Sequence, residues 1–323
     1  MGQYLPPRTR KKLADVDIMT KQARSSAGRI LARLHSRHIF HAYLFIAPVI
    51  ILFGLFRVWP SVQTLLYSFY QVELLKDRLT FIGLENFYSL FTDEIFRKAT
   101  VNTLTYVVTI VPISAFLGLL LAVLFNARFH LKEFFKAVYF SPMVTSTVAA
   151  AMVWWWMYNP QFGIFNVLLK LVGLPEQPWL MSSHMALPSI IIFSVWKNLG
   201  YNMIIYLAGL QAIPPQFYEA ATIDGASALK RFRHVTIPLL APTTTFILIY
   251  DTILALQVFD QVFVLTGGGP ANSTNVVVLD LYRQAFQRYN FGYAAAEAMV
   301  LFLFILAVTI LQYFYSKRYE VAY

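Results

Sequence analysis

The chain has 323 residues, of which 58% are hydrophobic and 13% are charged, and its net charge is +10. Soluble domains contain roughly 45–50% apolar and ~25% charged residues. So few polar residues cannot cover a soluble globule of this size, which excludes a cytosolic enzyme and a disordered chain. The sequence has no Cys, so disulfides, thiolate zinc sites and Cys nucleophiles are also excluded.

The first forty residues are strongly basic, with Asp15 and Asp17 as their acidic residues. A secretory signal has a short basic start, an apolar run of 7–15 residues and a small-residue cleavage site. This segment does not follow that pattern, so we predict a retained cytoplasmic tail over 1–40. Within it, residues 25–37 either form a basic amphipathic helix on anionic lipid or remain solvated and partly disordered.

Six segments are apolar enough to cross a membrane, since a membrane helix needs about 20 mostly apolar residues. The predicted spans are 42–59, 100–125, 137–157, 187–210, 237–265 and 294–314. The sequence therefore predicts an all-α membrane protein with six transmembrane helices. It shows no inverted internal repeat of the kind that many secondary transporters carry.

Positive charge predicts that both termini are cytoplasmic, because cytoplasmic loops carry an excess of Lys and Arg. The tail supplies most of the excess; without it the two sides carry equal numbers, but the inner loops are shorter and denser in charge. A charge distributed in this way favours a membrane over nucleic acid as the partner. The predicted organisation is a tail (1–40), a first span with an outer segment (41–99), a five-helix core (100–316) and a cytoplasmic end (317–323).

The outer segments have the patterns of folded structure. Residues 81–91 have the spacing of a small amphipathic helix, and the Pro- and Gly-rich residues 159–183 predict turns around a short helix at 165–172. Trp154, Trp155 and Trp156 form either an interfacial aromatic belt or the lining of an outward cavity. The run 267–270, Gly-Gly-Gly-Pro, lacks the Lys and Ser or Thr of a phosphate loop, so we expect a sharp turn.

The connection between spans four and five, residues 213–236, is the most informative segment. Its two prolines can start a new helix, which we predict over 216–223 with Glu219 in its early part, where a carboxylate suits the helix dipole. Gly225 ends or bends this helix, because Gly adopts left-handed angles freely. A second, basic helix is predicted over 226–234. The pair would form a cytoplasmic protrusion without any catalytic constellation.

This connection resembles the coupling-loop signature of ABC importer permeases. The matching residues are Glu219, Ala220, Ala221, Asp224, Gly225 and Ala226, followed by Phe232 and the run Ile-Pro-Leu-Leu-Ala-Pro over 237–242. The segments 265–270 and 292–296 are similar to the carbohydrate-uptake branch of that family. The resemblance covers residue 100 to the C-terminus and implies the type I ABC importer permease fold.

The resemblance also implies a mechanism and a set of partners. The coupling loop would dock in a cleft of a cytoplasmic ATPase subunit, with Glu219 and Asp224 making polar contacts and Ala220 and Gly225 allowing close seating. An alternative for Asp224 is that it only caps the second helix. The implied partners are a second homologous permease subunit, two ATPase subunits and an extracytoplasmic solute-binding protein in a bacterial inner membrane. ATP and Mg would bind to the ATPase, and this chain would hold no cofactor, metal or catalytic residue.

Polar groups inside the membrane are costly, so each one is a functional candidate. The candidates for the substrate path are Lys197, Asn198, Gly200, Tyr201, Asn202, Asp251, Gln257 and Asp260. The segments 199–203 and 251–258 resemble binding segments of the family, although Leu254, Ala255 and Val258 are smaller or less polar than in better-known sugar permeases. Interhelical hydrogen bonding is the alternative for each candidate, and Lys197 has Asp251 or Asp260 as alternative partners.

Three classes of function remain in competition at this point. An importer permease for a sugar or oligosaccharide explains the connection over 213–236. A secondary transporter or channel acting without an ATPase leaves that connection unexplained. A membrane-embedded enzyme lacks support, because the six His residues lie near termini or in loops and no nucleophile motif accompanies them. A charged glycan or glycerol phosphate ester stays open as substrate because of Lys197.

Overall fold

The computed structural model describes residues 43–73, 78–127 and 130–317. The chain divides into two compact units, up to Gln63 and from Thr64 onward, and each is described by itself. The predicted tail over 1–40, its possible helix over 25–37 and the terminal residues 318–323 lie outside the described part. Four described helices are long and apolar enough to cross a membrane, and two bent helix pairs raise that number to as many as six.

The described part of the first unit, residues 43–63, belongs to a helix that runs over Tyr43–Tyr67; the last stretch of this helix, α2 (Trp59–Tyr67), extends into the second unit. It contains a π-helical stretch, η1 (Gly54–Val58). No residue of its most apolar window is buried in the structure. A helix that is apolar on all sides needs lipid around it, so this helix suits the span predicted over 42–59 and continues beyond it.

The second unit opens with a β-hairpin that the all-α prediction missed. Strands β1 (Tyr70–Glu73) and β2 (Arg78–Phe81) pair antiparallel, with Tyr70 opposite Phe81. The hairpin is followed by α3 (Glu85–Thr92), the amphipathic helix expected over 81–91. Asn86 of α3 donates hydrogen bonds to the carbonyl oxygens of Ser68 (3.0 Å) and Tyr70 (3.1 Å). These bonds connect α3 to the residue just after α2 and to the first residue of β1.

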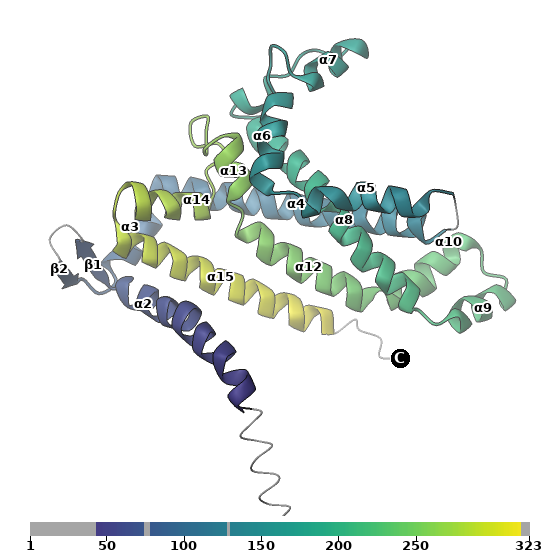
Figure 1. Ribbon diagram of the computed structural model, residues 1–323, viewed down its shortest axis with the longest axis horizontal. Coiled ribbons are helices and arrows are strands. Elements are labelled where there is room, and N and C mark those ends of the chain that lie inside the picture. Colours follow the sequence, from purple (N-terminus) through teal and green to yellow (C-terminus); the bar gives the residue numbers. More distant parts are fainter. Residues whose placement is uncertain (1–42, 74–77, 128–129, 318–323) are drawn as a thin grey trace, which may run out of the picture. The chain divides into compact units, whose positions relative to one another are not determined.

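Two long helices form the centre of the second unit, α4 (Glu94–Asn126) and α8 (Ala186–Ala212). They lie side by side in Figure 1. Asp93 caps α4 by accepting a hydrogen bond of 2.7 Å from the backbone N–H of Ile95. The two helices approach closely at Gly118, because a Cβ there would lie 2.6 Å from Cβ of Asn202. Both helices cover their predicted spans: α4 begins six residues earlier than predicted, and α8 agrees to within two residues at each end.

The third predicted span, 137–157, is broken rather than straight. It consists of α5 (Lys132–Val144) and α6 (Thr147–Met157), which meet at 100°. Pro142 lies in the last turn of α5, and a proline removes a backbone donor and disfavours helix in the residue before it. The chain continues into α7 (Ile164–Leu171), the short helix predicted over 165–172, and η3 (Trp179–Met181).

The fifth predicted span is also bent, by 62°. It starts earlier than expected, as α10 (Ala228–Arg231), η4 (Phe232–Thr236) and α11 (Ile237–Leu239) follow one another without a gap. After the bend it continues as α12 (Ala241–Leu256). The predicted span reached residue 265, but the helix stops at Leu256, and the separate α13 (Asp260–Leu265) follows.

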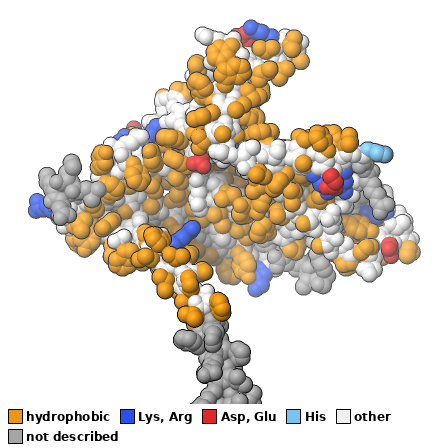
Figure 2. Space-filling view, viewed as in Figure 1, with side chains coloured by type: hydrophobic (Ala, Val, Ile, Leu, Met, Phe, Trp, Pro, Cys, Tyr) orange, Lys and Arg blue, Asp and Glu red, His pale blue; other side chains and the backbone are white. Residues whose placement is uncertain are grey.

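The last elements are α14 (Val277–Tyr282), η5 (Arg283–Gln287) and α15 (Phe291–Lys317). Gln312 of α15 donates a 2.9 Å hydrogen bond to Thr252 of α12. Figure 2 shows a face covered largely by hydrophobic side chains with few charged ones between them. A surface of this kind suits contact with lipid, because exposing so many apolar side chains to water is unfavourable.

Candidate functional site

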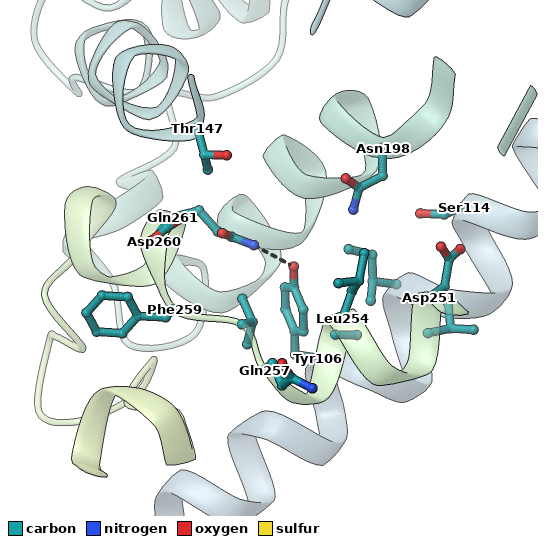
Figure 3. A pocket seen from close by; sticks show the side chains of 14 residues that line it. Tyr106, Ser114, Thr147, Asn198, Asp251, Leu254, Gln257, Phe259, Asp260 and Gln261 are labelled. Atoms are coloured by element: carbon teal, nitrogen blue, oxygen red, sulfur yellow. Dashed lines mark hydrogen bonds between the residues drawn. The ribbon is translucent and has the colours of Figure 1, made fainter. Parts of the chain in front are cut away.

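A polar cavity of about 280 Å³ lies between α4, α8 and α12 in the second unit. Its size is close to the lower end of ligand pockets, about 300 Å³. Figure 3 shows Asn198 of α8 and Asp251 of α12 entering it from different helices. The break after Leu256 matters here, since it frees Gln257 and Phe259 from the helix and lets Asp260 start α13 at the cavity.

Half of the predicted substrate-path residues line this cavity. They are Asn198, Asp251, Gln257 and Asp260. Together they offer two carboxylates, which accept hydrogen bonds, and two amides, which both donate and accept. Such a set can hold a ligand rich in hydroxyl groups.

Sequence reasoning passed over other polar residues of the cavity. Gln261, a polar residue of the fifth predicted span, also lines the cavity, and its amide donates a 3.0 Å hydrogen bond to the hydroxyl of Tyr106 (Figure 3). The residues passed over are Tyr106 and Ser114 on α4 and Thr147 on α6. The signal that could have identified them is a hydroxyl side chain within an apolar span. Their convergence depends on the packing of α4 against α8, which no local pattern gives.

Lys197 does not line the cavity and does not pair with either Asp, contrary to the expectation. Its ammonium donates hydrogen bonds of 2.9 Å to the carbonyl oxygens of Pro142 and Thr145. Those two residues lie at the C-terminal end of α5, just before the break, where the last helix carbonyls lack intrahelical partners; the hydroxyl of Thr145 also donates to the carbonyl of Pro142 (2.6 Å). Lys197 therefore fastens α8 to the broken span.

The other three candidates also serve contacts between helices. Gly200 permits close packing, because a Cβ there would lie 2.2 Å from the carbonyl oxygen of Tyr139 on α5. Tyr201 contacts the ring of Tyr250, with 4.9 Å between ring centroids. Asn202 is fully buried and donates a 2.6 Å hydrogen bond to Asp251 Oδ2. It thereby orients a residue of the cavity without lining it.

The predicted protrusion over 213–236 consists of α9 (Pro215–Ile223) and the helix that begins at α10. Gly225 has a left-handed φ of +69°. The N–H of Gly225 donates to Thr222 O (3.0 Å) and that of Ala226 donates to Ala221 O (2.9 Å). This pair of bonds is a Schellman motif, which ends a helix and needs Gly at its left-handed position. The bend expected at Gly225 is confirmed.

Two local expectations for the protrusion are wrong. Glu219 lies in the middle of α9 rather than in its first turn, because the helix begins at Pro215. Asp224 does not cap the second helix; Ser227 does, by accepting a hydrogen bond from the N–H of Lys230 at 3.4 Å. Glu219, Ala220, Asp224 and Gly225 are exposed, whereas Ala221 and Ala226 are half-buried. The polar residues are thus accessible to a partner.

The protrusion has a firm base. Ile213 is buried in a cluster with Leu210 and Leu240. The hydroxyl of Tyr218 on α9 lies 3.1 Å from that of Thr236 in η4. These contacts connect α9 to the end of α8 and to the residues that precede α12.

Of the outer features, the three tryptophans differ in part from their expected form, whereas the run 267–270 does not. Trp154 is a core residue, with its ring centroid 5.0 Å from that of Trp196, while Trp155 and Trp156 are more than half exposed. The run 267–270 forms the expected turn, with left-handed φ at Gly267 and Gly268. Arg283 donates a hydrogen bond to the carbonyl of Gly267 and holds this turn in place.

The family model described as the binding-protein-dependent transport system inner membrane component matches residues 96–321. The chain belongs to this family. The match covers the helices that line the cavity and the protrusion with its Schellman motif. It therefore identifies the chain as an ABC transporter permease, as the resemblance of residues 219–226 indicated.

Curated relatives of the permease family extend over most of the chain. A probable ABC transporter permease protein of Pyrococcus horikoshii is 37% identical over 86% of this chain and 96% of its own length. The sn-glycerol-3-phosphate transport system permease protein UgpA of Agrobacterium fabrum is 34% identical, over 85% and 94%. The trehalose/maltose transport system permease protein MalF of Thermococcus litoralis is 34% identical, over 87% and 95%.

Solved permease structures share the fold. A chain of a bacterial ABC transporter involved in the import of the acidic polysaccharide alginate matches with a TM-score of 0.78 and 25% identity, over 87% of this chain and 96% of its own. A structure of a bacterial alginate ABC transporter with an alginate-bound periplasmic protein matches with a TM-score of 0.77 and 24% identity, over the same shares.

Proposed function

We propose that the chain is the permease subunit of an ATP-driven importer that passes a sugar or oligosaccharide across a bacterial inner membrane. The observation that carries this proposal is the polar cavity between α4, α8 and α12 in a member of the permease family. The names of the relatives support the substrate class, since trehalose, maltose, a glycerol phosphate and a polysaccharide are all carbohydrates or close to them.

In this proposal the chain crosses the membrane six times with both termini in the cytoplasm. The first span is the helix before Gln63, and each bent pair counts as one crossing. Its organisation is a tail over 1–40, the first span and outer segment over 41–99, a five-helix core over 100–316 and the end over 317–323. The positive charge of the tail supports this orientation.

Coupling runs through the protrusion over 213–236. Glu219, Ala220, Asp224 and Gly225 seat in an ATPase subunit, with Ala221 and Ala226 behind them, and the contacts of Tyr218 and Ile213 connect that subunit to α8 and α12. Closure of the ATPase dimer would switch the cavity between inward and outward access. ATP and Mg bind to two ATPase subunits, and a second permease chain and an extracytoplasmic binding protein complete the importer.

The test uses tagged full-length chain expressed with its partners and purified from membranes. We expect an ATPase to co-purify and Glu219→Lys to reduce that co-purification and uptake at least tenfold, because charge reversal opposes docking of a carboxylate. Glu94→Lys makes the same change at an exposed position at the start of α4 and should leave both unchanged. Transport that persists without any ATPase would overturn the proposal in favour of a secondary transporter or channel.

A further inference from the structure

We propose that the cavity selects an uncharged, hydroxyl-rich saccharide and rejects sugars that carry a phosphate, sulfonate or carboxylate group. This inference rests on the proposed import function and names the substrate class of that same cavity. Four observations support it: the charge of the lining, the position of Lys197, the hydrogen-bonding groups available and the contrast with the relatives.

The lining of the cavity carries negative charge without positive charge. Asp251 and Asp260 contribute carboxylates, and none of the fourteen residues given by the structure as its lining is Lys, Arg or His. An anionic ligand would meet like charges in a space partly removed from water. Burying a charge without an opposite charge is unfavourable, and like charges in contact suppress binding.

Lys197 could have reversed this balance, because it precedes Asn198 of the lining. Its side chain instead points to the break between α5 and α6, where Pro142 and Thr145 accept hydrogen bonds from its ammonium. An ammonium has three donors, and two of them are taken. Moving it into the cavity would break both hydrogen bonds and leave the carbonyl of Thr145 without this donor, whereas the carbonyl of Pro142 would keep the hydroxyl of Thr145.

The remaining groups suit hydroxyls. A sugar hydroxyl both donates and accepts, so it can donate to Asp251 or Asp260 and accept from the amide of Asn198 or Gln257. Phe259 also lines the cavity, and its ring is held by packing against Phe263 and Tyr282. Ala255 and Val258 are small enough to leave the space open.

The relatives include transporters for both kinds of substrate. Two of them are named for the transport of the anionic substrates sn-glycerol 3-phosphate and alginate, and one for the neutral sugars trehalose and maltose. Overall identity does not separate them, since the two relatives that represent these kinds are both 34% identical to this chain. The charge of the cavity places this chain with the importers of neutral sugars.

The test measures equilibrium binding to the assembled permease and ATPase complex in nanodiscs, without nucleotide and without the binding protein. The probes are matched pairs: glycerol and sn-glycerol 3-phosphate, glucose and glucuronate, trehalose and trehalose 6-phosphate. We expect at least one neutral member to bind, and each neutral member that binds to do so about tenfold or more tightly than its anionic partner, the factor that ~1.4 kcal/mol gives. An anionic member that binds as tightly as its neutral partner overturns the proposal, and so does a panel in which no neutral member binds.

A charge reversal isolates the cavity from other causes of selectivity. Asp260→Lys should lower the preference for the neutral member at least tenfold, because it supplies the cation that the lining lacks. Glu94→Lys, the same charge change outside the cavity, should leave the preference unchanged; equal effects of the two variants would overturn the proposal. Binding needs no ATP turnover, so an assembled complex that imports no sugar with ATP would refute the import function and leave this binding measurement intact.

Discussion

The side-chain amide of Asn202 on α8 donates a 2.6 Å hydrogen bond to Asp251 Oδ2 on α12, at the wall of the polar cavity. Helix α4 packs against Asn202 at Gly118, where there is no room for a Cβ. One hydrogen bond therefore holds a carboxylate of the cavity in place and joins α8 to α12 where α4 packs against them. A residue outside the lining can in this way control the geometry of the lining.

Removing the amide should destabilise the helix bundle. Asn202→Ala leaves the carboxylate of Asp251 without this donor, which costs ~1.5–3 kcal/mol for a hydrogen bond to a charged group. We expect a lower thermal unfolding midpoint of the purified complex. Asp251→Asn keeps an acceptor at that position and should lower the midpoint less. An unchanged midpoint in Asn202→Ala would contradict the role given to this hydrogen bond.

Close packing of α8 against α5 can be tested at Gly200. Gly200→Ala puts a methyl group 2.2 Å from the carbonyl oxygen of Tyr139, and overpacking of this kind costs ~1–3 kcal/mol. We expect less folded complex and a lower unfolding midpoint. Gly54→Ala, in a helix with nothing within 4 Å of the new Cβ, should be neutral or slightly stabilising. Equal midpoints for the two variants would show that α5 yields at this contact.

The turn in the protrusion allows the left-handed backbone conformation of Gly225 to be tested without a steric clash. Nothing lies within 4 Å of a Cβ at Gly225, but its φ is +69°. Gly225→Ala should therefore cost ~1–2 kcal/mol from backbone conformation alone and reduce ATPase-coupled uptake. Gly225→Asn should retain more uptake, since Asn enters the left-handed region more readily than Ala. The ratio of uptake in these two variants is the readout, and a ratio of one would argue against the turn as the cause.

Asp280 predicts a pH dependence of the segment before α15. It is buried, and burial raises its pKa above the ordinary 3.8; Asp93 adds to the rise, while the hydrogen bond from Asn275 and the nearby Arg288 and Arg283 oppose it. A carboxyl whose pKa is raised on folding favours the folded state when protonated. The stability it contributes is therefore present at low pH and is lost as pH rises above about 4 toward the raised pKa.

The substitution Asp280→Asn should flatten this dependence. Its amide is uncharged at every pH, so the folded state no longer loses stability when the carboxyl would ionise. The measurement compares unfolding midpoints of the two proteins between pH 4 and pH 8. The wild type should lose more than the variant as pH rises, and parallel curves would show that other groups dominate.

Sequence patterns located the apolar spans and the bend of the protrusion, but not the breaks within two spans or the residue that caps the second helix of the protrusion. Apolar stretches located the spans, and Gly225 located the bend because its conformational freedom is a local property. The breaks at Pro142 and after Leu256 were missed, since an apolar run gives length and not direction. The hairpin at Tyr70 and Phe81 was missed because its four-residue strands are too short to show an alternation.

The cavity was only half predictable, for a physical reason. Polar residues in an apolar span are visible in the sequence, but the partner that each one finds depends on packing. Lys197 and Asn202 donate hydrogen bonds to carbonyl and carboxylate groups of other helices. Tyr106 enters the cavity from α4, a helix that carried none of the candidates.

The clamp at Lys197 has a consequence for how the chain is inserted. Of the four long helices, α8 has the lowest mean hydropathy, 1.3 against 1.9 to 2.7, and a Lys at a helix centre costs ~2.5–3.5 kcal/mol on insertion scales. Its carbonyl partners lie on the α5–α6 pair, which is synthesised earlier and is available when α8 arrives. We expect α8 to insert poorly without residues 132–157 unless Lys197 is replaced by Leu, as measured by glycosylation mapping during translation in microsomes. Equal insertion with and without that pair would contradict this dependence. If the dependence holds, the order of the segments along the chain also sets the order in which they can insert into the membrane.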